Sequence, residues 1–234
     1  MRQIKLEVIV QSKQEAIEAL KLGADRLELV SAMKEGGLTP SYGTMKQVLE
    51  NVEIPVQIMV RPHSYNFFYT EADFEVIVED VKAIRELGGN RIVFGALNQD
   101  GTVNASMLKE LINQFPEIDI TFHRAFDEVT SQEEAYQTLC NYPSNVKRIL
   151  TSGGKPNCME GKEHLRKLVK LQQELGGPVI MPGSGLTPEN IQEIKQTTEA
   201  TEFHFGKSVR VEQSFANGFD EETVDGVLRV LKEG

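Results

Sequence analysis

The most constraining feature of this sequence is a unit that recurs eight times: a short apolar run followed by a helix-like stretch. The runs are IKLEVIV (4–10), DRLELV (25–30), IPVQIMV (54–60), RIVFGA (91–96), DITFHRA (119–125), VKRILTS (146–152), PVIMPG (178–183) and EFHFGK (202–207). Between them, Ser131 and Thr187 are suited to cap the starts of helices. Strands that alternate with helices predict a parallel sheet. Eight such units in 234 residues match a (β/α)8 barrel, which typically has about 250 residues.

An open, doubly wound sheet is the alternative arrangement of these units. That architecture normally carries a glycine-rich nucleotide-binding turn after its first strand. Here the first run continues into VQSKQEA (10–16), which has no GxGxxG pattern. No linker or shift in composition divides the chain. We therefore predict an α/β protein that forms one TIM-barrel domain over residues 1–234.

Charge and composition argue against several classes of partner. The chain has 25 basic and 35 acidic residues, a net charge of −10, without the basic stripe of a nucleic-acid binder. No apolar run approaches the roughly 20 residues that span a bilayer, and MRQIKLEVIV (1–10) lacks the apolar core of a signal peptide. Cys140 and Cys158 have no CxxC spacing. We expect a cytoplasmic protein with reduced thiols that binds neither nucleic acid nor membrane.

Side-chain alternation along the strands predicts a polar barrel interior. Successive residues of a strand point to opposite faces, so Leu6 and Val8 suit the helix side and Glu7 the interior. The same argument sends Arg26 inward and collects a further polar set in the interior: Glu7, Glu28, Arg61, His123, Glu202 and His204. Buried charge is costly unless it is paired or solvated. These groups therefore either neutralise one another or line a wet pocket at the C-terminal ends of the strands, where active sites of this fold lie.

The stretch TFHRAFD (121–127) concentrates reactive groups at the end of one predicted strand. His123 beside Glu7 and Glu28 is suited to be a general base, with a carboxylate fixing its tautomer. Arg61 is suited to hold a carboxylate or phosphate bidentately. The candidate catalytic residues are Glu7, Glu28, His123 and Asp127, and the candidate ligand-binding side chains are Arg61, Arg124 and His204. The alternative is that the histidine and the glutamates only satisfy each other.

Two turns of small residues, LTSGGKPN (150–157) and MPGSGL (181–186), follow the sixth and seventh runs. Backbone N–H groups in such turns can approach an anion closely, and the late loops of this fold often form a phosphate site. Glycines also serve tight turns that bind nothing, so both interpretations stay open. The candidate anion-binding residues are Thr151, Ser152, Gly153, Gly154, Gly183, Ser184 and Gly185.

Motifs along nearly the whole chain resemble the CutC copper-homeostasis family. They are GADRLELVSAMKEGGLTPSYG (23–43), VRPHSYNFFYTEADFEVIVEDV (60–81), VFGALNQDG (93–101), TFHRAFD (121–127), ILTSGG (149–154), MPGSGL (181–186) and EFH (202–204). The resemblance implies a cytoplasmic TIM barrel, often a dimer, that is linked to copper tolerance and, in some members, to Cu(I) binding.

The chain departs from the family pattern at positions that bear on copper. Where many members read EVC and ELC, this chain reads EVI (7–9) and ELV (28–30), so Ile9 and Val30 replace the thiols proposed as copper ligands. The family's RPRGGDF appears as RPHSYNF (61–67). Cu(I) prefers soft sulfur ligands. The resemblance thus implies Cu(I), but the residues supply no metal-ligand set, and we assign none.

Three functional hypotheses follow. The first is a CutC-type copper-homeostasis protein, which needs sulfur ligands if it binds Cu(I). The second is a TIM-barrel enzyme or binding protein for a small phosphate- or carboxylate-bearing metabolite, which needs a solvent-open polar pocket. The third is a non-catalytic interaction protein, which needs a large exposed apolar patch. The sequence leaves open whether the protein is an enzyme.

Overall fold

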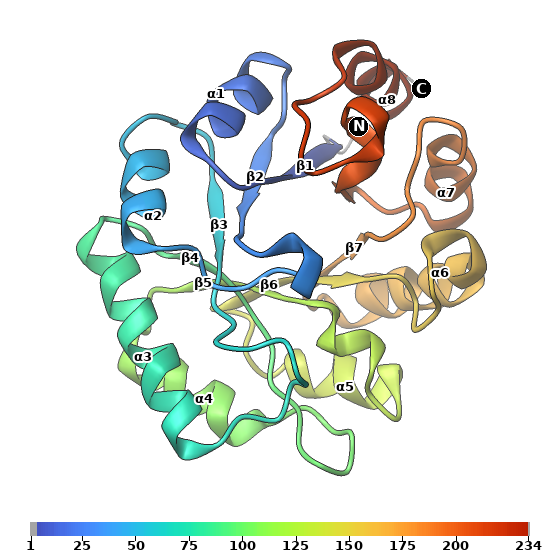
Figure 1. Cartoon of the computed structure of the whole chain (residues 1–234). Helices are drawn as coiled ribbons and strands as arrows, with labels where there is room; N and C mark the ends of the chain where they lie inside the picture. Colours follow the sequence, from blue (N-terminus) through green and yellow to red (C-terminus); the bar gives the residue numbers. More distant parts are fainter. Residues whose placement is uncertain (1–3, 234) are drawn as a thin grey trace.

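The computed structural model describes residues 4–233 and shows eight strands and eight α-helices in strict alternation (Figure 1). The strands are β1 (Lys5–Val10), β2 (Arg26–Leu29), β3 (Val56–Met59), β4 (Arg91–Phe94), β5 (Asp119–Phe122), β6 (Val146–Thr151), β7 (Val179–Pro182) and β8 (Glu202–Phe205). The helices are α1 (Lys13–Lys21), α2 (Tyr42–Leu49), α3 (Glu71–Glu86), α4 (Ala105–Gln114), α5 (Gln132–Leu139), α6 (Cys158–Leu175), α7 (Ile191–Thr198) and α8 (Glu221–Glu233). This confirms the (β/α)8 barrel. The ends of the predicted domain, residues 1–3 and 234, lie outside the described residues.

The strands form one parallel sheet in the order β7-β6-β5-β4-β3-β2-β1-β8. Gly183, which follows β7, forms a parallel bridge with His204 of β8, and this brings the two ends of the sheet together. The helices surround the strands (Figure 1). β8 therefore lies between β7 and β1, and residues from the two ends of the sequence can share one site.

Local capping explains where several helices begin. The hydroxyl of Ser131 accepts a hydrogen bond from the Glu134 N–H at 3.3 Å, so the predicted start of α5 is confirmed. The helix expected to start directly after Thr187 begins instead at Ile191. Residues 187–190 form a turn there, in which the Asn190 side chain accepts from the Thr187 N–H at 2.9 Å.

The alternation of strand side chains is confirmed. Leu6 and Val8 belong to the large apolar core between sheet and helices. A second, small apolar cluster lies inside the barrel and consists of Ile9, Val30, Met59 and Val93, with Met33 and Phe215 packed against it. No helix within residues 4–233 is long and apolar enough to cross a membrane.

Candidate functional site

A network of ion pairs fills the interior of the barrel. Arg26 donates to the carboxylate of Glu7 through Nε and to Glu202 Oε2 through Nη2 at 2.7 Å. Arg148 donates to Asp119 Oδ1 at 2.8 Å and its Nε lies 3.7 Å from Glu202 Oε2. The sequence placed Glu7, Arg26 and Glu202 of this network inside the barrel. Reading the same alternation back to the first residue of β5 and along β6 would have added Asp119 and Arg148.

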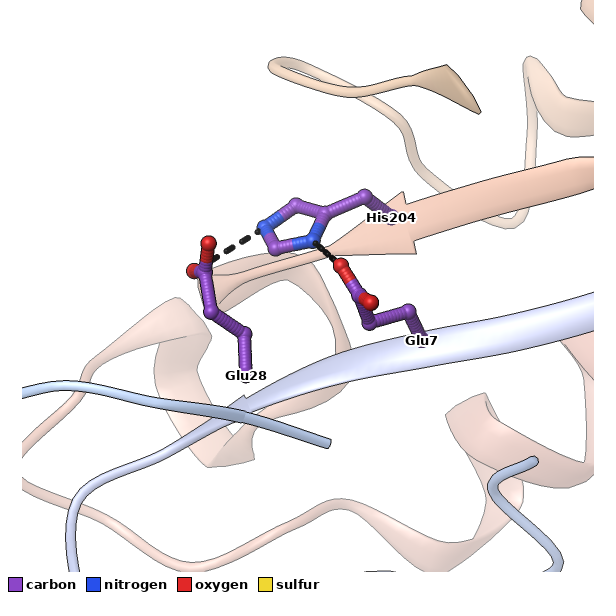
Figure 2. A group of neighbouring side chains, drawn as sticks. All are labelled: Glu7, Glu28 and His204. Carbon is purple, nitrogen blue, oxygen red and sulfur yellow. Dashed lines mark hydrogen bonds and ion pairs between the residues drawn. The ribbon is translucent and has the colours of Figure 1, made fainter. Parts of the chain in front are cut away.

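Glu7, His204 and Glu28 lie side by side on β1, β8 and β2 (Figure 2). The imidazole Nδ1 of His204 is 2.8 Å from Glu7 Oε1, and its Nε2 is 3.6 Å from Glu28 Oε2. All three side chains are buried. Sequence reasoning placed all three inside the barrel but paired the glutamates with His123; the structure pairs them with His204.

The two glutamates of this group differ in their proton affinity. Burial raises the pKa of Glu7, but Arg26 and His204 outweigh it and hold the pKa well below its usual range. Burial raises the pKa of Glu28 to about 7, and the neighbouring Glu7 charge adds to that effect, against His204 and Arg26. Burial lowers the pKa of His204, but Glu28 and Glu7 raise it above its ordinary value. Glu7 is therefore a fixed anion, whereas Glu28 and His204 can exchange a proton near neutral pH.

The composition of this group is that of a metal site, because one ligand atom from each residue lies within 4.8 Å of the others. Both oxygens of Glu7 are, however, already engaged, one by Arg26 and one by His204. Only Glu28 and His204 Nε2 remain. Two protein ligands fall short of the three or four that zinc sites use, so we do not identify these residues as metal ligands.

A cavity of about 740 Å³ opens at the C-terminal ends of the strands. The side chains that face it include Glu28 and His204 from inside the barrel and Arg61 and His123 from just beyond β3 and β5. Glu7 does not line it. The walls also include Ile9, Val30, Met33, Met59, Phe67, Ser184, Gly185 and Lys207. The interior charges thus form a structural network around Glu7 and Arg26 and, in addition, contribute to a pocket.

Arg61 is distinguished from the other buried arginines by its lack of a counterion. Four arginines are buried among the described residues. Arg26, Arg148 and Arg210 each pair with a carboxylate. In residues 4–233, Arg61 has no carboxylate within ion-pair distance; its terminal nitrogens face the backbone carbonyls of residues 35–37 and 64 at 3.3–3.4 Å. Its Nε is buried without a partner.

His123 accepts a hydrogen bond from the backbone and is not paired with the glutamates that the sequence placed beside it. Its Nδ1 accepts from the Ala125 N–H at 3.2 Å, so the proton of the neutral ring sits on Nε2. Burial, with Arg61 adding to it, lowers the pKa of His123 to about 3. Nε2 is buried and has no partner among the described groups. The ring lies 4.8 Å from the ring of Phe67, over which the Arg61 guanidinium stacks at 4.7 Å.

Asp127 occupies the turn that the sequence assigned to an external anion. Its carboxylate accepts hydrogen bonds from the Thr151 hydroxyl, from Ser152 N and Oγ at 3.1 and 3.0 Å, and from Gly154 N at 3.0 Å. Arg124 also donates to it, at 2.8 Å. The chain's own carboxylate thus engages donors of Thr151, Ser152 and Gly154 that the sequence had assigned to an external anion. Asp127 also lines the cavity described above, so this carboxylate lies at the pocket while the turn holds its oxygens.

The turn after β7 has a different environment. Gly183 packs tightly, because a Cβ there would meet Leu150 Cδ1 at 2.4 Å. Ser184 adopts a left-handed φ of 92°, which non-glycine residues rarely do. Ser184 and Gly185 line the cavity, together with Gly206, Lys207 and Ser208 after β8. Of the two glycine turns, this is the one that faces the cavity without a carboxylate of the chain filling it.

Comparisons with known proteins agree with one another. The model of the family described as "CutC family" matches residues 4–209. A human protein named copper homeostasis protein cutC homolog is 39% identical over 199 residues, 85% of this chain and 71% of the human one. A CutC family protein of Treponema denticola is 37% identical, covering 91% of this chain and 85% of its own. The crystal structure of a CutC protein from Streptococcus agalactiae superposes with a TM-score of 0.79 at 28% identity, over 87% of this chain and 98% of that one.

Proposed function

Since the chain belongs to the CutC family, we propose that it takes part in copper homeostasis, the role named for its human relative. The observation that supports this is the 39% identity over 85% of the chain. The barrel shared with the Streptococcus agalactiae protein is consistent with it. In cells that lack this protein, copper tolerance is expected to fall and to return when the chain is supplied; unchanged tolerance would count against the proposal.

The donor set of the pocket does not fit a thiolate site for Cu(I). Ile9 and Val30 line the pocket where many family members carry thiols. Cys158 is fully buried, and burial, with Asp127 adding to it, raises the pKa of its thiol to about 12. Neither Cys158 nor Cys140 lines the pocket. Among the described residues, the sulfur-containing side chains that line it are the thioethers Met33 and Met59, so we propose a copper role that does not use thiolates in this pocket.

Competition with a chromogenic Cu(I) chelator tests this directly. Wild type is expected to withdraw no more copper than Cys140→Ser/Cys158→Ser, because burial raises the pKa of both thiols and neither lines the pocket. Ile9→Cys/Val30→Cys is expected to gain stoichiometric binding, since it restores two soft ligands within one cluster. Tight wild-type binding that the double serine variant loses would show that copper uses the native thiols after all.

A second proposal concerns the pocket itself: it binds a small phosphate- or carboxylate-bearing metabolite. The observation that favours it is Arg61, the one buried arginine of the described chain without a carboxylate. An unpaired buried charge costs several kcal/mol, and an anionic ligand would offset that cost. Arg61 Nε and His123 Nε2, both without partners, are the donors we assign to it, with Ser184 and Gly185 facing the same cavity.

Binding of inorganic sulfate, followed by calorimetry, is the first measurement for this pocket. Arg61→Met, which removes the charge but keeps an unbranched stem, is expected to weaken binding roughly 10- to 100-fold, the value of one or two charge-assisted hydrogen bonds. Arg166→Met, at a half-exposed position on α6, serves as the matched control and should bind like wild type. Equal affinity in the Arg61 variant would refute the anion site.

We further propose a cytoplasmic location and a homodimer, both of which the family resemblance implies. The location is supported by the two cysteines, which are free, as is usual in a reducing compartment. Apolar side chains exposed on neighbouring helices, Tyr42 on α2 and Val76 on α3, are available for a contact between subunits. Cell fractionation and light scattering distinguish these proposals from a secreted or monomeric protein.

A further inference from the structure

We propose that the pocket takes up one proton when it binds its anion, and that Glu28 and His204 hold this proton between them. The proposal rests on the anion pocket proposed above and adds a property of the ligand. The bound molecule carries, besides its anionic group, a hydroxyl or carbonyl oxygen that accepts a hydrogen bond from Glu28. Hydroxy acids, oxo acids and sugar phosphates have this chemistry.

Glu28 is the counterpart of Arg61: among the buried glutamates of residues 4–233, it is the one that pairs with no arginine or lysine. Three glutamates are buried among the described residues. Glu7 and Glu202 both pair with Arg26. Within residues 4–233, only His204 comes within ion-pair distance of Glu28. Glu28 Oε1 is buried and has no hydrogen-bond partner, although its side chain lines the cavity. A neutral carboxyl at this place would have a hydrogen to give to a ligand.

The geometry of His204 leaves one of its nitrogens for proton exchange. Glu7 is a fixed anion held by Arg26, so Nδ1–H of His204 donates to it at 2.8 Å. The exchangeable position is then Nε2, which faces Glu28 (Figure 2). Glu7 acts here as a positioning residue.

Electrostatics couples this proton to the anion. The charged groups that act on Glu28 are His204 on β8, Glu7 on β1 and Arg26 on β2. An anion held by Arg61 and His123 adds negative charge to the same cavity, which increases the proton affinity of Glu28 and His204. Linkage is reciprocal, so the proton must also tighten anion binding. The pKa of Glu28, about 7, places this dependence near neutral pH, and a proton stored there equips the pocket for general acid catalysis.

Sulfate is a suitable probe because it stays a dianion at all relevant pH values, so any pH dependence belongs to the protein. Wild-type affinity between pH ~5.5 and ~8.5 is expected to fall as pH rises, approaching about tenfold per unit above the pKa. Glu28→Gln is expected to lose the dependence near neutral pH and to keep only a weaker one at lower pH, because its amide is neutral throughout and His204 loses the Glu28 charge that raises its pKa. The control, Glu50→Gln on the outer surface beside Lys46, should keep the wild-type dependence.

Proton uptake would be refuted, and the anion pocket retained, by either of two results. One is a wild-type sulfate affinity that does not change with pH, and the other is a Glu28→Gln variant whose affinity changes with pH as that of wild type does. Absence of sulfate binding in wild type would instead refute the anion pocket. The shared proton has a separate readout that needs no ligand: carbon-13 NMR of labelled glutamate should show one carboxyl that titrates near neutral pH and disappears in Glu28→Gln. If no such carboxyl exists, the shared proton is refuted as well.

Discussion

Replacing Glu7 with alanine is expected to destabilise the protein by about 3–5 kcal/mol, the cost of leaving a buried ion-pair partner uncompensated. Glu7 is 1% exposed and receives hydrogen bonds from both Arg26 and His204. Its removal leaves the Arg26 guanidinium with Glu202 alone and deprives His204 Nδ1 of its acceptor. Water cannot easily replace the carboxylate, because the site lies beneath the cavity rather than on its wall.

Urea unfolding at neutral pH, followed by circular dichroism, measures this loss. Glu50→Ala on the outer surface is the matched control: its carboxylate is half-exposed and lies 3.9 Å from Lys46. Exposed pairs of that kind contribute less than about 1 kcal/mol. A Glu7 variant no less stable than the Glu50 variant would show that the interior network does not hold the barrel together.

Glu28→Gln is expected to have the opposite effect, a stabilisation that appears only at higher pH. Folding raises the pKa of Glu28 from 4.5 to about 7. Below pH 4.5 Glu28 is protonated in both the folded and the unfolded chain, so the pKa shift does not change the stability. Between the two values the unfolded chain releases its proton while the folded chain keeps it, so wild-type stability falls as pH rises, and above about pH 7 the loss is complete. Each pKa unit corresponds to 1.36 kcal/mol, so the full loss is at most about 3 kcal/mol.

The measurement is the difference in unfolding free energy between wild type and Glu28→Gln at pH ~5 and pH ~8. The unfolding free energy of the variant should equal that of wild type or be slightly smaller at the lower pH. At the higher pH it should be larger than that of wild type. Glu35→Gln removes a carboxylate from an exposed position at the cavity mouth. Its unfolding free energy should change with pH in the same way as that of wild type. A difference that does not change with pH would mean that Glu28 ionises as freely as it does in the unfolded chain.

The barrel was predictable from the sequence because its signals are local. Apolar runs such as IKLEVIV and the helix-like stretches between them report their own secondary structure. Strand alternation then predicted which side chains face inward. Leu6 lies in the core between sheet and helices, and Glu7 and His204 lie inside the barrel, as it predicted. The start of α7 was misplaced because the residues after Thr187 fold as a turn first.

The partners of the polar side chains were not predictable in the same way. His123 was paired with the glutamates on the strength of its strand position, but His204, 197 residues from Glu7, takes that place. The TSGG turn has the residues of an anion site, but the anion that its donors bind is the Asp127 carboxylate of the same chain, 25 residues before Ser152. No local pattern specifies which side chain reaches a given set of donors.

The sequence by itself thus determined the repeating unit, the inward set of charges and the family. Only the tertiary structure decided which charges neutralise one another and which remain available, namely Arg61 and Glu28. The physical reason is that secondary structure follows from periodicities over a few residues. Pairing and proton affinity depend on distances of a few ångströms between distant segments and on the water that folding removes from around them.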